Sequence, residues 1–437
     1  MEMKLFKRTM AVLLSAAMII TAMSSGAFAA STTYTSDNYK AALTKTEAYT
    51  AAKLAKSAAG GEWLVLGLSR DDADIDNSLY DDYKYALLQE VKADAGVLSQ
   101  RNYTVYAKTV LTWGALGGNP AKIGGYNFFK KLADMDALKN TGLMGPTWAL
   151  IALEYKNYQI PAVTGITNVT TREKLVDYLL NAEIKTGGFA LSGNTPDCDV
   201  TAMVLQALAP FSYTRSDVKA CVDRGLKVLS DMQNSDGSFS SGGVTNSESA
   251  AQVIVVLTTL GIDPTTDSRF IKNGVDPVDS LLTFFDPSTG GFRHVNAAAD
   301  GYQAVVNGMA TEQAQYALVA YKRFKAGRSS LYDITDVKTA AQIKVPAKTA
   351  ITYIASPKKG TLVLKWKKVA GATGYEIIRS KNLTHSDTIT VKVRTSLSKT
   401  LKNLPKGNYY IKIRTYKICG AIKVYGGDTA VKRIKIS

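Results

Sequence analysis

The sequence predicts a mainly α-helical chain that ends in a small all-β module. Up to about residue 325, apolar residues recur at helical spacing, and longer amphipathic segments alternate with shorter, almost wholly apolar ones. From residue 349 the apolar period becomes two, as in β-strands. Residues 326–348, between these parts, are polar, weakly periodic and interrupted by Pro346, so we interpret them as a linker.

Helix pairs fill residues 38–325 in this prediction, six in all, repeating about every 40 to 60 residues. A helix that is apolar on nearly all sides must be covered, whereas one with a polar stripe can face water. The pairs therefore indicate an inner and an outer ring of helices. The expected outer helices are 38–58, 78–95, 126–137, 172–183, 215–233 and 275–285, and their inner partners are 61–70, 103–116, 147–155, 199–208, 248–260 and 311–324.

The module at residues 349–437 shows short runs of alternating apolar and polar residues with turns between them. Such runs are typical of a β-sandwich, here of about 90 residues. The expected strands are 362–368, 375–380, 389–393, 409–417 and 422–427.

Residues 1–30 have the composition of a secretory signal peptide. A basic start is followed by a short apolar run, and the segment ends in the small-residue sequence AFAA. No later apolar run is long enough to span a bilayer. We therefore expect a secreted, extracellular protein that does not span the membrane.

Positive charge is concentrated at the C-terminal end. The chain has a formal net charge of +16, and residues 338–437 hold 22 Lys and Arg against three Asp and Glu, a net of +19. On an exported protein, such a module favours contact with an anionic cell-wall polymer or acidic polysaccharide over nucleic acid. The alternative is that the lysines only solvate a small β domain.

Few residues are available for metal or redox chemistry. The three cysteines lie at unrelated spacings, and with two histidines the chain has no CxxC or HExxH sequence. We expect no cofactor and no metal centre with nitrogen and sulfur ligands, which leaves calcium bound by carboxylates as the open alternative.

Acidic residues begin three of the expected inner helices. Aligning these helices on their first alanine makes Asp199, Ser247 and Thr311 equivalent, and all three are good N-cap residues. Glu248 and Glu312 follow in the first turn, where a carboxylate complements the helix dipole. If the helix starts meet at one end of a ring, these side chains form an acidic mouth over an apolar interior.

The segment RGLKVLSDMQNSDGSF, residues 224–239, has Gln233, Gly237 and Phe239 at a characteristic spacing, and shorter TGGF forms recur at two other turns. Residues 38–325 thereby resemble the terpenoid cyclase and prenyltransferase family, which carries the squalene–hopene cyclase repeat. The resemblance implies an (α/α)6 toroid barrel with one open, ligand-accessible end.

The sequence PDCDV resembles the Asp-x-Asp-Asp motif of proton-initiated cyclases in that family. Asp197 and Asp199 match the first two acidic positions, Val200 replaces the third, and the resemblance implies that Asp199 is the acid. The prenyltransferase branch binds zinc through Asp-x-Cys and a later His. Here Asp197 and Cys198 are adjacent and His294 has no evident partner, so no zinc site is implied.

The C-terminal strands resemble fibronectin type III modules. WKKVAGATGYEI, residues 366–377, matches the passage from the second to the third strand, and residues 401–416 match a Leu-x-Pro-x-Gly turn that leads to a tyrosine corner. The resemblance implies that Tyr410 is the corner residue and that these positions hold the core.

We interpret the chain as a secreted, surface-associated bacterial protein. The leading hypothesis is non-catalytic binding of an extracellular ligand or glycan at the open end of the ring, with the basic module contacting the anionic cell surface. The rival is an enzyme, either a degenerate terpene cyclase or a carboxylate-dependent glycan-active one. The candidate catalytic residues are Asp199 and Asp197, and the candidate ligand-binding residues are Glu248, Glu312, Gln313 and His294.

Overall fold

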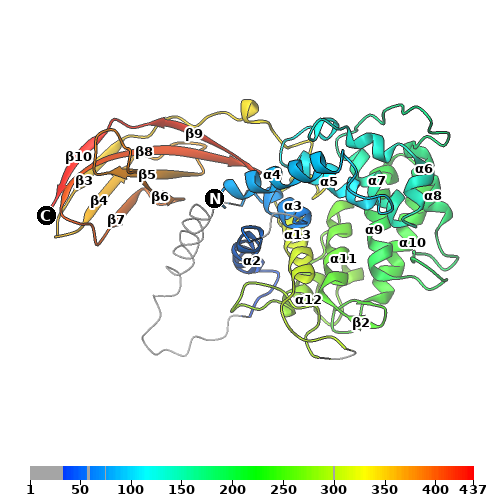
Figure 1. Cartoon of the computed structure of the whole chain (residues 1–437). Coiled ribbons are helices and arrows are strands. Elements are labelled where there is room, and N and C mark those ends of the chain that lie inside the picture. The colour runs from blue at the N-terminus through cyan, green and yellow to red at the C-terminus, as the bar shows by residue number, and fades with distance from the viewer. Residues whose placement is uncertain (1–32, 57–59, 74, 299–300) are drawn as a thin grey trace.

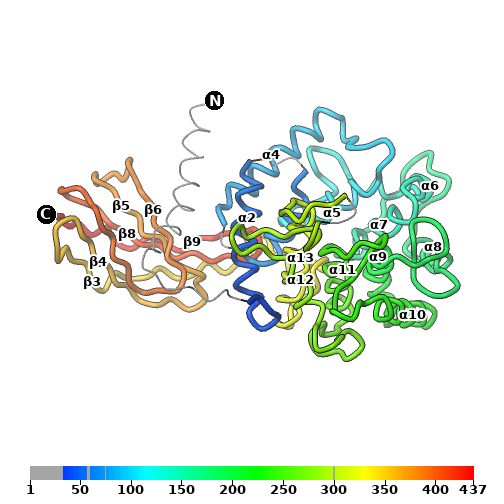
Figure 2. The backbone as a smooth tube through the Cα atoms, turned by 90° about the horizontal axis from the view of Figure 1, so that it is seen from below, coloured from blue at the N-terminus to red at the C-terminus, as the bar shows by residue number. Residues whose placement is uncertain are grey.

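The structure is a computed structural model that describes residues 33–56, 60–73, 75–298 and 301–437. The predicted signal peptide at residues 1–30 lies outside the described residues. Helices gather on one side of the molecule, and the strands from β3 onward form a separate body beside them (Figures 1 and 2). The prediction of a helical part with a C-terminal β module is confirmed.

The inner helices of the described chain form a closed cycle of contacts. Each packs against the next in sequence, and the last packs back against the first (Figure 1). They are apolar on nearly all sides, and in α11 every residue except the last is buried. The inner helices are α3 (Glu62–Arg70), α5 (Thr104–Ala115), α7 (Met144–Glu154), α9 (Cys198–Leu208), α11 (Ser247–Thr259) and α13 (Gly308–Lys325).

The outer helices cover this cycle and bury one stripe each. On α10 the buried positions recur three and four residues apart, from Val218 to Leu229, so the stripe faces α9. The outer helices are α2 (Tyr39–Leu54), α4 (Ser78–Ala93), α6 (Met135–Lys139), α8 (Arg172–Asn181), α10 (Ser216–Met232) and α12 (Pro277–Thr283).

One expected outer helix, residues 126–137, is broken in the structure. It is replaced by a 3-10 turn, η2 (Phe128–Leu132), and the short α6. The side chain of Asn127 accepts a hydrogen bond from the Phe129 N–H, and Asp134 accepts from the N–H groups of Asp136 and Ala137. These local hydrogen bonds begin two short elements and so prevent one continuous helix.

The Gln/Gly/Phe motif ties the end of α10 to the turn before α11. Gln233 Nε2 donates to the carbonyls of Gly237, at 3.0 Å, and Phe270, at 2.9 Å. Gly237 has a φ of +81°, and a Cβ there would lie 2.7 Å from the Val275 side chain. Phe239 is fully buried, so the motif has a packing role.

The β module is a two-sheet antiparallel sandwich. One sheet has the order β10-β8-β5-β6 with β9 also pairing β8, and the other has the order β3-β4-β7. The short β3, β7 and β10 were not predicted, because they are largely exposed and lack strong apolar alternation. The strands are β3 (Ile351–Ala355), β4 (Leu362–Trp366), β5 (Gly374–Ser380), β6 (Ile389–Val393), β7 (Ser398–Leu401), β8 (Gly407–Cys419), β9 (Ile422–Asp428) and β10 (Lys432–Ile436).

The predicted corner residue Tyr410 is wrong, because its neighbour Tyr409 has that role. Tyr409 is buried, and its hydroxyl donates to the Pro405 carbonyl at 2.9 Å. Alternation along β8 turns Tyr409 inward together with Ile411 and Ile413, while Tyr410 points to the other side of the sheet.

Residues 329–337, predicted to belong to the linker, instead pack into the helical part. Leu331, Tyr332 and Ile334 are buried in the helical core. Asp336 accepts from Arg70 Nη1 at 2.7 Å and from Arg323 Nη2 at 2.6 Å. Both guanidinium groups are almost fully buried and also donate to carbonyls of this segment. The segment thus covers the C-terminal ends of α3 and α13.

The β8–β9 hairpin contacts the helical part through its tip. The Gly420 N–H donates to the Asp72 carboxylate, and Asn77 Nδ2 donates to the Ala421 carbonyl at 2.8 Å. Ala421 is buried in the helical core. The hairpin therefore joins the β module to the same end of the helical part that residues 329–337 cover. In the part of the chain described, no helix is long and apolar enough to cross a membrane.

We predict that Asp336→Asn lowers the free energy of unfolding by about 3–5 kcal/mol, because it leaves the buried charges of Arg70 and Arg323 unpaired. Urea titration at pH 7 measures this. The control, Asp231→Asn, breaks an exposed pair with Lys227 and should cost under about 0.5 kcal/mol. Equal effects of the two variants would contradict the assignment.

Candidate functional site

Three junctions in the described chain, each between an outer and an inner helix, share one hydrogen-bonding pattern. The residue before each inner helix accepts from the backbone N–H three positions on, at 2.8–3.0 Å. Its own N–H donates to the carbonyl of a buried phenylalanine in the preceding turn. The capping residues are Asp197, Asn246 and Asn307, and their phenylalanine partners are Phe189, Phe239 and Phe292.

The prediction that Asp199, Ser247 and Thr311 are the N-caps is therefore wrong. Alignment on the first alanine shifted the three helices relative to one another, whereas the backbone aligns them on their caps. Thr311 instead accepts from the Phe292 N–H at 2.9 Å, as Thr201 does from Phe189. Asp199 and Glu248 then become equivalent second residues of α9 and α11, free of a capping role.

Glu248 and His294 form a largely buried pair. Glu248 Oε2 lies 2.8 Å from His294 Nδ1 and accepts from Ser247 Oγ at 2.9 Å. The 2.8 Å separation fits a hydrogen bond donated by the Nδ1–H of His294 to the Glu248 carboxylate. His294 Nε2 is buried and lacks a hydrogen-bond partner among the described residues. No sequence pattern indicates this pairing across 46 residues, whereas the structure brings the two side chains together.

Asp199 is the second unsatisfied group at this end of the ring. Its Oδ1 and the Ser249 Oγ are buried and have no hydrogen-bond partner beyond each other in the described chain, and the Ser249 hydroxyl favours the ionised form of Asp199. Burial raises the pKa of Asp199 to about 6, helped by Asp197 and Glu248 and opposed by Ser249 and His294. Asp199 can therefore carry or release a proton near neutral pH.

Asp197 is held more firmly than Asp199. Its Oδ1 caps α9, and its Oδ2 accepts from Ser241 Oγ at 2.6 Å. Ser241 belongs to a small hairpin of β1 (Ser240–Ser241) and β2 (Val244–Thr245) that precedes α11. Asp197 thus has structural partners on both oxygens, and Ser249 is a site residue that the sequence analysis missed. Its position directly after Glu248 was the available signal.

Glu312 lies on the side of the mouth formed by α13, α3 and α5. Burial raises its pKa to about 7, with Lys108 opposing and Glu62 adding to the shift. Lys108 Nζ lies 3.3 Å from Glu62 Oε2. Asp199 and Glu312 both help to raise the pKa of the fully buried Tyr316, so they approach the same interior residue.

Amide and aromatic side chains pack across the interior of the ring. Gln252 Nε2 donates to Gln313 Oε1 at 2.7 Å and to Tyr316 Oη at 2.6 Å. Gln206 Nε2 donates in turn to Gln252 Oε1 at 3.0 Å. The predicted ligand residue Gln313 is thus part of an internal network. An aromatic cluster adjoins this network and consists of Trp63, Trp148, Tyr316 and Tyr332.

No protein-family model matches the chain, and no curated protein matches it significantly. The described residues contain no group of three or more His, Cys, Asp or Glu side chains arranged to hold a metal ion. The site is therefore defined by its geometry: the buried polar atoms of Asp199, Ser249 and His294, with incomplete hydrogen bonding, around the N-terminal ends of α9 and α11. From here on, the term acidic mouth means Asp199, Glu248, Ser249 and His294.

We predict that Asp199→Asn stabilises the protein at high pH. The folded-state pKa of about 6 exceeds the ordinary 3.8, so the wild-type free energy of unfolding falls by about 3 kcal/mol as the pH rises through this interval. Asparagine cannot ionise and avoids this loss. Urea titrations at pH 3.5 and pH 8 should show a difference between variant and wild type that grows in favour of the variant.

The exposed Asp223→Asn, on α10, serves as the control for losing one carboxylate and should change stability by under about 0.5 kcal/mol at pH 8. An Asp199→Asn effect that is the same at both pH values would show that burial does not disfavour the ionised Asp199.

Proposed function

We propose that residues 38–325 form a terpenoid cyclase- and prenyltransferase-like (α/α)6 toroid, and that the C-terminal module is fibronectin type III-like. The closed cycle of inner helices, the outer helices that cover it and the packing role of Gln233 and Gly237 support the first assignment. The two-sheet sandwich and the Tyr409 corner support the second.

The function that we propose is binding of a polar extracellular ligand or glycan at the acidic mouth, in a secreted, surface-associated bacterial protein. The observation that carries this proposal is a set of buried polar atoms with incomplete hydrogen bonding: Asp199 Oδ1 and Ser249 Oγ, which have only each other, and His294 Nε2, which has no partner in the described chain. Each unsatisfied buried polar group costs about 1–3 kcal/mol. A ligand with several hydroxyl groups could satisfy a carboxylate acceptor, a hydroxyl and an imidazole nitrogen together.

The filled interior favours a short polar ligand over a long apolar chain. Gln252 and Tyr316 are held in a hydrogen-bonded network, and the aromatic cluster packs beside it. This packing supports binding at the rim more than the deep tunnel that a cyclised polyene needs.

A carboxylate-dependent, glycan-active enzyme is the second candidate. The observation that favours it is Asp199, whose pKa of about 6 suits a general acid near neutral pH, close to the paired Glu248 and His294. General acid–base catalysis would need Asp199 to be protonated at one step and ionised at another.

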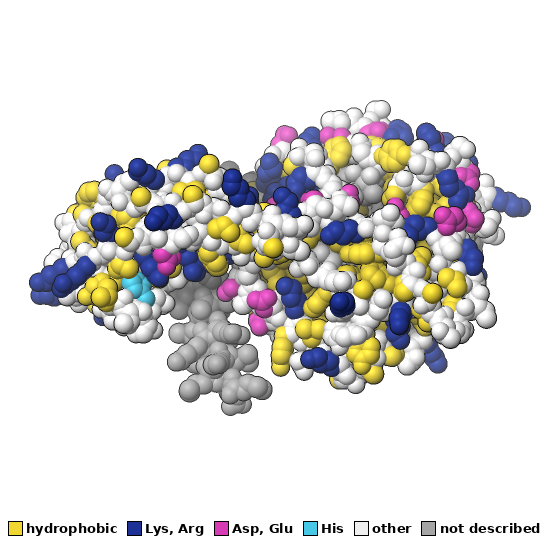
Figure 3. Space-filling view, turned by 90° about the horizontal axis from the view of Figure 1, so that it is seen from above, with side chains coloured by type: hydrophobic (Ala, Val, Ile, Leu, Met, Phe, Trp, Pro, Cys, Tyr) yellow, Lys and Arg dark blue, Asp and Glu magenta, His cyan; other side chains and the backbone are white. Residues whose placement is uncertain are grey.

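The basic module supports attachment to an anionic cell surface. Lys and Arg side chains are spread over the face of the module seen in Figure 3, in line with the net charge of +19 over residues 338–437. Attraction of this kind acts over a Debye length and does not need a deep pocket.

We predict that the chain binds soluble cell-wall glycan fragments and that His294→Ala weakens binding at least tenfold, because it removes one ligand-facing nitrogen and frees Glu248. Isothermal titration calorimetry measures the affinity. Glu173→Gln, on the exposed face of α8, is the control and should bind like wild type.

Product analysis by mass spectrometry separates the two candidates. Turnover by wild type that is lost in Asp199→Asn would replace binding with catalysis. Absence of both binding and turnover across the fragments would rule out a glycan ligand at the mouth.

We predict that the full chain binds cell-wall preparations and is released by salt, because 1 M salt shortens the Debye length to about 3 Å. Co-sedimentation at increasing NaCl measures this. Asp199→Asn should sediment like wild type if the basic module makes the contact. Retention that is insensitive to salt would argue against an electrostatic attachment.

A further inference from the structure

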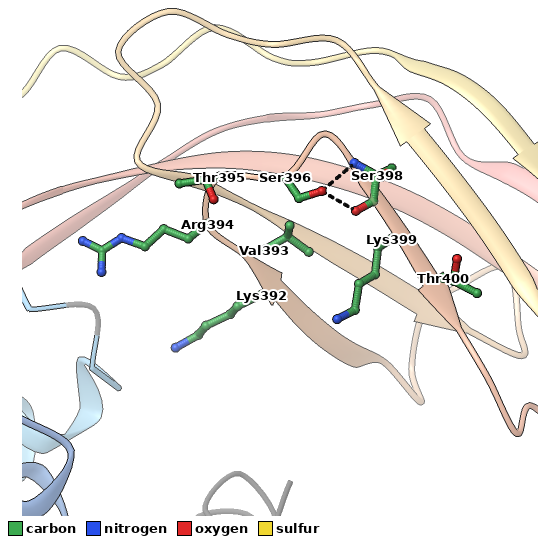
Figure 4. Close-up of a pocket in the computed structure, with 8 residues that line it drawn as sticks. All are labelled: Lys392, Val393, Arg394, Thr395, Ser396, Ser398, Lys399 and Thr400. Carbon is green, nitrogen blue, oxygen red and sulfur yellow. Dashed lines mark hydrogen bonds between the residues drawn. The ribbon is translucent and has the colours of Figure 1, made fainter. Parts of the chain in front are cut away.

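An open groove of about 530 Å³ lies on the β module where β6 leads into β7 (Figure 4). Its walls carry three cationic side chains and several hydroxyl groups. Lys392 and Arg394 come from the end of β6 and the connection after it, and Lys399 comes from β7. β6 and β7 are edge strands of different sheets, so the groove follows the open side of the sandwich.

The cations point outward in a regular way. Val393 is buried and its neighbours Lys392 and Arg394 are exposed, so those two extend to the same side, about 7 Å apart along an extended backbone. Lys399 is also exposed, on the opposite wall.

None of these cations forms an ion pair among the described residues, but Arg394 lies near enough to Glu47 of α2 to act to lower its pKa. The acidic residues of the module all have other partners. Glu376 pairs with Arg414 and Lys423, and Asp428 pairs with Lys412. Asp387 accepts from Ser380 and from the Lys381 N–H. The groove therefore presents positive charge that no carboxylate of the module pairs with, and only Arg394 is partly offset, by Glu47 of the helical part.

Hydroxyl groups complete the lining. Ser396 Oγ donates to the Ser398 carbonyl at 2.8 Å and accepts from its N–H at 3.2 Å, which holds the connection in shape (Figure 4). The exposed hydroxyls of Thr395 and Thr400 lie beside the cations. An Arg fork, Lys ammonium groups and hydroxyl donors together match the several oxygens of a phosphate group.

The lining argues against other anionic partners. The described residues that line the groove include no aromatic side chain on which nucleobases could stack. Its one apolar residue, Val393, is buried and offers nothing to a lipid tail.

We propose that this groove binds the phosphate groups of a linear, non-aromatic phosphodiester polymer. The inference rests on the proposed contact between the basic module and an anionic cell surface, and it names the chemistry of that contact. The alternative is that lysines on the edge strands only prevent strand pairing between molecules. If this were their only role, substituting the groove cations would weaken polymer binding no more than substituting other lysines of the module.

The test uses the full chain and poly(glycerol phosphate) as the probe, with affinity measured at 50 mM and 200 mM salt. The triple variant Lys392→Gln/Arg394→Gln/Lys399→Gln should bind at least tenfold more weakly at 50 mM salt. Because each phosphate contact contributes about 0.7 to the slope of log K against log salt, the slope should fall by about 2.

The matched control removes the same charge elsewhere. Lys358→Gln/Lys359→Gln/Lys406→Gln changes exposed lysines in the β3–β4 and β7–β8 turns, beside the C-terminus. This variant should lose less than threefold in affinity. Equal losses in the two triple variants would overturn the groove assignment, because general attraction alone predicts them.

Two further arms identify the partner. Polygalacturonate of similar charge density should bind more weakly than poly(glycerol phosphate), and equal or tighter binding would overturn the preference for phosphate. Tighter binding of a thymidine oligonucleotide would also overturn the proposal. If wild type binds neither the probe nor cell-wall preparations, the proposed function of the module fails as well. If wild type binds both and the groove variant is unaffected, only the groove assignment fails.

Discussion

Two buried guanidinium groups and the single carboxylate between them set the architecture of the helical part. Arg70 ends the first inner helix and Arg323 lies near the end of the last, and both charges are removed from water. Burying such charges without a partner costs several kcal/mol each. Burial acts to raise the pKa of Asp336, but the two arginines lower it to about 2, so Asp336 stays ionised between them. This interaction joins the first inner helix to the last and holds residues 329–337 over the end of the ring.

The candidate site lies at the other end of the ring, where the inner helices α9 and α11 begin. The N-termini of α9 and α11 are capped by Asp197 and Asn246, so Asp199 and Glu248, although they lie in the first turn, are not the caps of their helices. Burial without full hydrogen bonding destabilises the folded state, and this cost is typical of residues kept for a ligand. The arginine cluster, on α3 and α13, and the candidate site, on α9 and α11, thus lie at opposite ends of the ring.

The β module uses charge differently from the helical part. Its carboxylates neutralise a few cations next to the sheet, with Glu376 bonded to Arg414 and Lys423, while the other Lys and Arg side chains face solvent. The β8–β9 hairpin contacts the helical part through Gly420 and Ala421, near the covered end of the ring. The acidic mouth belongs to the helical part and the basic groove to the β module, and the two parts of the chain carry net charges of opposite sign. This division agrees with our proposal of a polar ligand at the mouth and an anionic surface at the module.

The sequence by itself determined where helices and strands form, because apolar periodicity and turn residues act over a few positions. It located the inner helices closely and the main strands of the sandwich, and it selected Asp199, Glu248 and His294. The tertiary structure decided the details that depend on distant partners. The N-caps were predicted at the wrong residues, because each true cap residue contacts a Phe carbonyl that lies several residues upstream in a turn. Residues 329–337 looked like a linker because their burial depends on Arg70, about 260 residues earlier. The pairing of Glu248 with His294 likewise exists only once α11 and the segment before α13 are folded together, since no local pattern encodes a contact across 46 residues.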